Sequence, residues 1–159
     1  MIEGPYLVLT VVGVLATALV AGIFCAFSVL VMRGLAALPP AQGAATMNAI
    51  NRAALTPAFM VVFLGATLVS VVLAVVTFVL WPREGAVELL IGSASYLLGA
   101  FGVTAAANVP RNDALMRHGA DSPEAAAYWP SYLREWTRWN HVRTMASAAS
   151  ALAYVLALL

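Results

Sequence analysis

Long uncharged stretches separated by short polar clusters are the main pattern of this sequence. No charged residue lies between Glu3 and Arg33, and this run exceeds the about 20 residues that a helix needs to cross a bilayer. Similar runs follow, each bounded by proline, aromatic or charged residues. The pattern predicts four membrane-spanning helices in a single domain, residues 1–159, with approximate spans 5–32, 53–81, 88–109 and 139–159.

A polar segment precedes the second span. After Pro39-Pro40, the pattern predicts an amphipathic helical lead-in from Ala41 to Leu55. Asn48, Asn51 and Arg52 share one face of this helix, at i, i+3 and i+4. A solvated face at the membrane interface is the simpler interpretation of these three residues, and the wall of a site is the alternative.

A second polar segment lies between the third and fourth spans. Pro110 lacks an N–H and crowds the preceding turn, so it is expected to kink or end the third helix. A long polar loop is then predicted from Leu115 to Pro130, with Ser131 as the N-cap of the last helix.

Small residues recur at spacings of three or four in two of the spans. The first span carries Gly13, Thr17 and Ala21 on one stripe, and Ala18, Gly22 and Ala26 on another. The third span carries Gly92, Ser95, Gly99, Gly102 and Ala106. Such stripes let neighbouring helices approach closely, so they predict helix-packing surfaces.

Composition agrees with an all-α membrane protein, a bundle of four transmembrane helices. Hydrophobic residues make up 63% of the chain and charged residues only 9%, with a mean hydropathy of +0.92. The net charge of +1 comes from eight arginines, without lysine, against seven acidic residues. This balance excludes nucleic acid as a partner and leaves the lipid bilayer.

Metal and cofactor chemistry find little support. Cys25 is the one cysteine and lies inside an apolar run, and His118 and His141 are the two histidines, far apart in sequence. No metal-binding motif or phosphate-binding glycine motif is present. We therefore expect no metal and no cofactor.

Four spans place both termini and the Trp81–Glu88 connection on one side of the membrane, and both longer connections on the other. Seven of the eight arginines then share the side of the longer connections. The positive-inside tendency predicts that this side is cytoplasmic and that the termini lie outside, in a multi-pass protein of the plasma (inner) membrane.

Polar residues at the helix ends are the candidate chemistry. Trp136, Asn140 and Arg143 share a helical face, and Trp139 lies four residues before Arg143. Only 16 residues follow Arg143, about 24 Å of helix, which is less than a hydrocarbon core of about 30 Å. Either the bilayer is thinner at this point or Arg143 lies below the interface, at membrane depth. Polar groups there are costly unless paired, so they indicate either a functional site or a polar clamp between helices.

Two motifs resemble the anthrone oxygenase-like family of small membrane proteins. They are Asn-Val-Pro-x-Asn-x-x-Leu at residues 108–115 and Trp-x-x-Trp-Asn-x-x-Arg at residues 136–143. Asn51-Arg52 and Pro57-Ala58-Phe59-Met60 are similar to the family's second-helix entrance. The resemblance implies four membrane helices and, from the family's characterised fungal members, oxidation of an anthrone to an anthraquinone by dioxygen without an evident metal or organic cofactor.

This chemistry needs a base, groups that hold an oxyanion and an aromatic wall that excludes water. His141 or Asp113 is the candidate base, although a solvated histidine and an Asp113–Arg117 pair are the simpler interpretations. Arg143 and Arg111 are the candidate anion stabilisers. The other candidate substrate-binding residues are Asn51, Arg52, Asn108, Asn112, Trp136, Trp139 and Asn140.

Two functional hypotheses remain open from the sequence. The first is a cofactor-independent oxygenase that acts on a flat, phenolic aromatic molecule with dioxygen. The second is a non-enzymatic membrane protein, alone or in a homo-oligomer, in which Asn108, Asn140 and Arg143 clamp helices 3 and 4 together. A pocket bounded by Asn108, Asn112, Trp139 and Arg143 would favour the enzyme, and a solidly packed bundle would favour the clamp.

Overall fold

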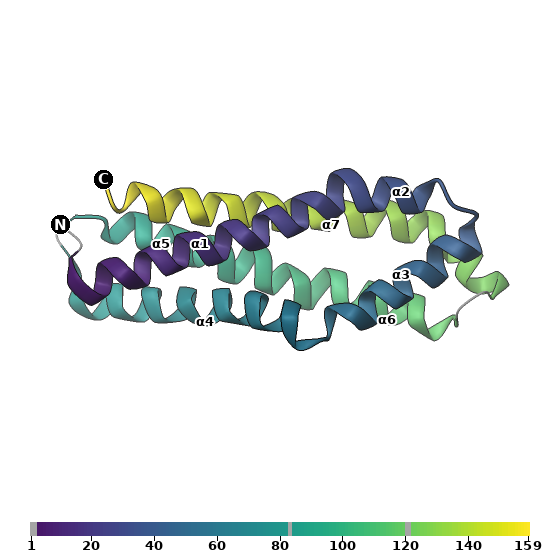
Figure 1. Ribbon diagram of the computed structural model, residues 1–159, viewed down its shortest axis with the longest axis horizontal. Coiled ribbons are helices and arrows are strands. Elements are labelled where there is room, and N and C mark those ends of the chain that lie inside the picture. The colour runs from purple at the N-terminus through teal and green to yellow at the C-terminus, as the bar shows by residue number, and fades with distance from the viewer. Residues whose placement is uncertain (1–2, 83, 120–121) are drawn as a thin grey trace.

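The computed structural model describes residues 3–82, 84–119 and 122–159, and within these ranges every regular element is helical. The elements form five rods (Figure 1). The first rod consists of α1 Gly4–Ala26, η1 Phe27–Val31 and α2 Met32–Ala36. α3 Pro40–Ala54, α4 Pro57–Leu80 and α7 Pro123–Leu156 each form a rod of their own. The remaining rod, which contains the third predicted span and which we call the third rod, consists of α5 Ala86–Ala94, η2 Ser95–Gly102, η3 Thr104–Asn108 and α6 Val109–Arg117. The three η segments are π-helical.

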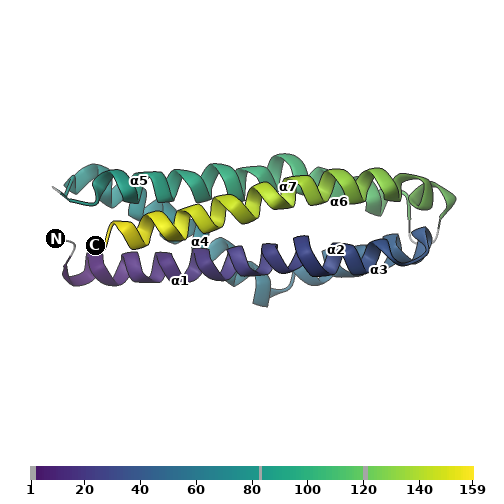
Figure 2. The ribbon, with the colours of Figure 1, turned by 90° about the horizontal axis from the view of Figure 1, so that it is seen from above.

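The rods lie side by side in an elongated bundle (Figures 1 and 2). Both chain ends and the α4–α5 connection lie at one end of the bundle. The α2–α3 and α6–α7 connections lie at the other end, which we call the polar end. α3 and α4 together run the length of one side, because the chain breaks for only two residues, Leu55 and Thr56, between them.

Three helices are long and apolar enough to cross a membrane: Gly4–Ala36, Pro57–Leu80 and Ala86–Arg117. α7 is not among them. Large apolar side chains such as Leu15, Leu68 and Phe78 point outward on these helices. The interior also holds small polar residues, such as Thr17, whose hydroxyl donates to Gly13 O at 2.8 Å. Large apolar side chains that face outward are the arrangement expected in lipid, so the helices fit a membrane protein.

The predicted lead-in before the second span is confirmed, since α3 covers almost all of it and α4 begins with Pro57 at its first turn. The solvated face expected for its polar residues is wrong for two of the three. Asn48 and Asn51 are buried, at 2% and 8% exposed, whereas Arg52 is exposed. The reason is that α3 packs its amide face against α6 and α7, which contribute the polar end of the bundle.

Pro110 does not end the third rod, so the second of the two outcomes expected from the sequence, a kink or an end, is wrong. Val109 keeps helical angles, φ −60° and ψ −48°. The π-helical turn of η3 precedes the proline directly, so the hydrogen-bond ladder is already shifted where the proline N–H is missing. The guanidinium of Arg111 also donates to Ala107 O at 2.8 Å. The proline is therefore accommodated inside a continuous rod.

The long polar loop predicted between the third and fourth spans is also wrong. α6 continues to Arg117 and α7 begins at Pro123, so most of the predicted loop is helix. Ser122 rather than Ser131 caps α7, since its hydroxyl accepts from Ala125 N at 2.9 Å. Proline in the first turn, an acidic residue after it and a run of alanines all favour a helix start here.

A buried aromatic and aliphatic cluster holds the polar end together. It comprises Met32, Leu35, Ala44, Met47, Leu115, Ala125, Trp129, Tyr132 and Trp136. Trp129 and Tyr132 stack with ring centroids 5.5 Å apart. Gly43 of α3 faces the Trp129 indole so closely that no side chain fits between them. Packing within this cluster stabilises helix, in place of the predicted loop, at the polar end.

Glycines confirm two of the predicted packing stripes. A Cβ on Gly13 would lie 2.8 Å from Leu73 Cδ1, and one on Gly92 would lie 2.6 Å from the Tyr154 ring. The other stripe of the first span, which contains Gly22, faces outward. Packing between helices therefore uses one face of the first rod and one face of the third.

Replacing Gly99 by alanine tests the close approach of the third rod to α7. The added Cβ would overlap the Cβ of Ala146, so a helix must shift. We expect the free energy of unfolding to fall by about 1–3 kcal/mol, measured by thermal unfolding in detergent. Gly22→Ala is the matched control, because nothing lies within 4 Å of its added carbon. An equal loss in both variants would contradict this packing.

Candidate functional site

A cavity of about 490 Å³ lies inside the bundle at the level of the α3–α4 break. α1, α3, α4, the third rod and α7 all contribute to its wall. The wall is largely apolar and includes six aromatic side chains: Phe24, Phe27, Phe59, Phe63, Phe101 and Trp136. The polar side chains of the wall are Asn51, Thr104, Asn108, Asn112 and Arg143. A few polar groups converging in an apolar cavity are typical of a small-molecule site.

Arg143 supplies the cavity's buried positive charge. Its side chain extends from α7 and is 5% exposed. Nη1 donates to Thr104 Oγ1 at 3.2 Å, and Nη2 donates to Asn140 Oδ1 at 2.6 Å. The guanidinium carbon lies 4.2 Å from the Phe24 ring centroid and 5.0 Å from that of Trp136. No carboxylate of the described residues pairs with it, so only dipoles and aromatic faces offset its charge.

Three polar atoms of the cavity wall have no hydrogen-bond partner in the described part of the chain. They are Arg143 Nε, Asn51 Nδ2 and Asn108 Oδ1. Asn108 also donates through Nδ2 to Trp136 O at 3.3 Å, which fixes its amide toward α7. Buried polar atoms are normally paired, so two unpaired donors and an unpaired acceptor on side chains that line one cavity make this wall a candidate place for a polar ligand.

Asn112 organises the polar side of the cavity. Its Oδ1 accepts from Tyr132 OH and from Trp136 Nε1, both at 2.8 Å. Burial raises the pKa of Tyr132, which lies before the predicted fourth span, so the phenol stays protonated and donates. Asn112 therefore fixes the orientation of the Trp136 indole, which lies beside the Arg143 guanidinium.

Asn140 lies beside the cavity without lining it. Its side chain is fully buried, and Nδ2 donates to Phe24 O and to Ser28 Oγ, each at 2.7 Å. Its Oδ1 accepts from Arg143. The amide therefore ties α7 to the first rod and orients the guanidinium.

Five of the predicted site residues lie away from the cavity. His141, Asp113 and Arg52 are exposed, and Trp139 is 37% exposed. Arg111 forms an ion pair with Glu135 at 2.9 Å near the surface. Successive residues of a helix lie about 100° apart, so His141 and Asp113 point away from the faces that carry Asn140 and Asn112. The pocket that would favour the enzyme hypothesis is present at Asn108, Asn112 and Arg143, with Trp136 in its wall in place of Trp139.

The sequence reasoning missed Thr104, Phe63 and Phe101. Thr104 lies four residues before Asn108, so the shared helical face was the signal that could have identified it. Phe63 and Phe101 carried no such signal, because they come from two spans that only tertiary packing brings together, with ring centroids 6.0 Å apart. Among the described residues, no three His, Cys, Asp or Glu side chains are grouped closely enough to hold a metal ion.

The cavity opens sideways. Several of its wall residues are also exposed on the outer surface: Leu55, Leu64, Phe101, Ala105 and Val109. They come from the α3–α4 break, α4 and the third rod. The mouth of the cavity is therefore apolar and lies on a face of the long helices that is suited to lipid.

Comparison with known proteins identifies the chain. A family model described as anthrone oxygenase matches residues 59–153. Neither the curated proteins nor the solved structures contain a match. The matched region includes the cavity residues of α4, the third rod and α7, and it covers more than half of the sequence. The chain belongs to the anthrone oxygenase family.

Proposed function

We propose that the protein is a membrane monooxygenase that oxidises a flat phenolic aromatic molecule of the anthrone type with dioxygen, without a metal or organic cofactor. One observation carries this proposal: Arg143 is buried, has no acidic partner among the described residues, and lines an aromatic cavity next to Asn108. Family membership supports the same substrate class.

The buried charge is the main physical argument. A guanidinium at membrane depth is costly unless an anion or several dipoles offset it. Asn140 and Thr104 accept hydrogen bonds from two of its nitrogens, whereas Nε has no partner among the described residues. An anthrone that has lost its central proton carries negative charge on its oxygen, and that oxygen would accept from Arg143. The anion, rather than the neutral substrate, would then be favoured in the cavity.

The reaction balances with dioxygen as the only oxidant. The central methylene loses a proton, and the resulting anion passes one electron to dioxygen. The two radicals combine into a carbon–oxygen bond, and the peroxide takes up a proton. Loss of the remaining hydrogen of that carbon breaks the oxygen–oxygen bond, leaving a ketone and releasing water. One oxygen atom enters the product and the other leaves as water.

The base roles expected for His141 and Asp113 do not fit this cavity, because neither residue lines it. Its wall contains amides, a hydroxyl, an indole and one guanidinium. We propose that Arg143 favours ionisation of the bound substrate and that the proton leaves toward the polar end, along Asn51 and Asn108, to water. The residue roles are thus anion holding by Arg143, hydrogen bonding by Asn51 and Asn108, and stacking by Phe24 and Trp136.

The membrane placement we propose has four spans, with the C-terminal part of α7 as the fourth. α4 has 24 residues, about 36 Å of helix, which is close to the thickness of a hydrocarbon core with its edges. The α3–α4 break then lies near one membrane surface, and the cavity lies just below it. The arginine-rich polar end faces the cytoplasm, and both termini lie outside.

A structural clamp is the second candidate function, and Asn140 is the observation that favours it. This amide bonds the first rod and Arg143 at once, so part of the motif holds helices together. The clamp joins α7 to the first rod rather than chiefly to the third. Arg143 and Asn108 belong to both candidates, but Asn140 does not line the cavity, so a variant at Asn140 tests the clamp.

Arg143→Gln tests the enzyme. We expect oxygen consumption with an anthrone to fall by about 100-fold or more, since the charge that stabilises the anion is lost. The measurement uses an oxygen electrode and purified full-length protein, with folding checked by thermal unfolding. Arg117→Gln, which removes an exposed arginine of the polar end, is the control and should stay active. Equal activity in both variants and the wild type would sink the enzyme proposal.

Asn140→Leu tests the clamp. Two donor contacts to the first rod disappear and the Arg143 guanidinium loses an acceptor. We expect the free energy of unfolding to fall by about 1–3 kcal/mol, measured in detergent. His141→Leu is the matched neighbour, exposed and outside this network, and should change stability little. A stable Asn140→Leu protein would rule out the clamp.

Ala105→Trp tests entry of the substrate from the membrane. Ala105 is exposed at the mouth of the cavity, so a bulky ring should narrow the opening and raise the KM for an apolar anthrone by about tenfold. Ala106→Trp is the control, because Ala106 is equally exposed and does not line the cavity. The same KM in both variants would argue against this entrance.

A further inference from the structure

A second hollow, of about 540 Å³, lies on the outer surface between the first rod and α7. It does not share a wall residue with the inner cavity. Its floor is apolar and includes Val29, Met32, Ala36, Pro130 and Leu133. We call this hollow the basic groove, because of the residues along its rim.

Three arginines and a histidine form that rim. Arg134, Arg138 and His141 follow one another on α7 at i, i+4 and i+7, so they share one helical face. Arg33 faces them from α2. All four residues are exposed.

The rim charge is not neutralised within the described part of the chain, where no carboxylate pairs with Arg33, Arg134 or Arg138. Glu135, the acidic residue adjacent to Arg134, is bound to Arg111 instead. Three guanidinium groups around one hollow repel one another, and a bound anion would relieve that repulsion.

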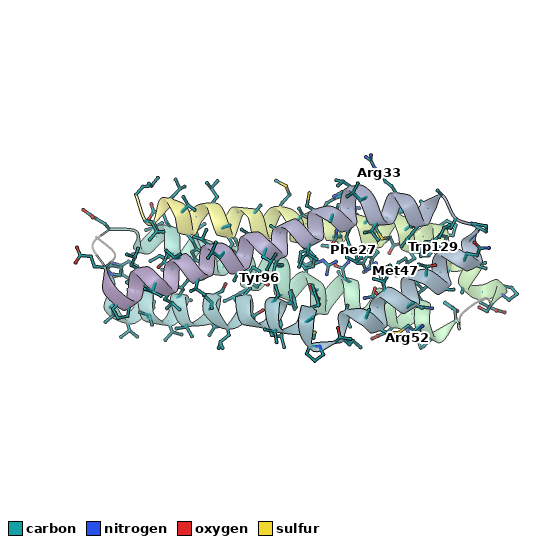
Figure 3. All side chains as sticks on the ribbon, in the orientation of Figure 1. Phe27, Arg33, Met47, Arg52, Tyr96 and Trp129 are labelled. Atoms are coloured by element: carbon teal, nitrogen blue, oxygen red, sulfur yellow. The ribbon has the colours of Figure 1, made fainter. Side chains whose placement is uncertain are left out.

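The groove lies at the expected depth of lipid headgroups. Ser28 belongs to its wall and also accepts a hydrogen bond from Asn140. One end of the groove therefore lies at the same depth along the bundle as Asn140. The sequence-predicted spans 5–32 and 139–159 both reach their polar-end boundary here. Arg33 projects from the edge of the bundle opposite to Arg52 (Figure 3). The groove therefore combines apolar surface on the membrane side with positive charge where that surface ends.

We propose that the basic groove binds the phosphodiester headgroup of an anionic phospholipid, with an acyl chain lying against Val29 and Met32. Basic pockets between membrane helices on the cytoplasmic side recognise such headgroups, and each arginine near the surface adds to the attraction. The arginine fork also matches phosphate oxygens in geometry. This site is independent of the proposed oxidation, since the two hollows use different faces of α7.

The test is lipid binding by the purified full-length protein in nanodiscs. Phosphatidylcholine discs with and without one tenth phosphatidylglycerol are compared by thermal unfolding, and retained lipid is counted by native mass spectrometry. The groove variant is Arg134→Gln with Arg138→Gln. The control variant, Arg52→Gln with Arg117→Gln, removes the same charge from exposed arginines outside the groove.

We expect phosphatidylglycerol to raise the Tm of the wild type and the control variant, and to bind the groove variant at least about tenfold more weakly. Added salt should weaken the effect in the wild type. An equal loss in both variants, or no preference for phosphatidylglycerol over phosphatidylcholine, would overturn the proposal. Displacement of the lipid by millimolar inorganic phosphate would identify a free-anion site and also overturn it.

Discussion

The burial of Arg143 is the constraint on which the rest of this structure depends. A guanidinium placed among membrane helices must have its donors met, and here Asn140 and Thr104 meet two of them while two aromatic faces cover the plane. Asn140 is itself held by the first rod. The hydrogen bonds around this one charge therefore connect α7 with the first rod and with the third rod. Arg143 also lines the cavity between these helices.

α7 divides its chemistry between two faces. Trp136, Asn140 and Arg143 point into the bundle, where they build the cavity wall and the network behind it. Arg134, Arg138 and His141 point outward into the basic groove. The helical repeat places the two sets on different faces of α7, so the proposed oxidation site and the proposed lipid site share no residue.

The polar end shows where reasoning from sequence succeeds and where it fails. The cost of polar groups at membrane depth singled out Asn108 and Arg143, which both line the cavity, because that cost depends on residue type and position in the span. The same reasoning treated residues 115–130 as a loop, because proline, glycine and charge signal a break when each is considered alone. Packing of Trp129 and Tyr132 against α3 outweighed those local signals and extended the helix.

The sequence by itself determined the helical architecture, three membrane-compatible spans and the small set of polar residues from which any site had to be built. Hydropathy and helical periodicity depend on residues that are close together in the sequence, so a single sequence is enough to identify them. Only the tertiary structure decided that Trp136 lines the cavity in place of Trp139, that Asn140 belongs to the scaffold, and that His141 and Asp113 face away. Each of these outcomes depends on the rotation of one helix against its neighbours, which is set by side chains far apart in the sequence.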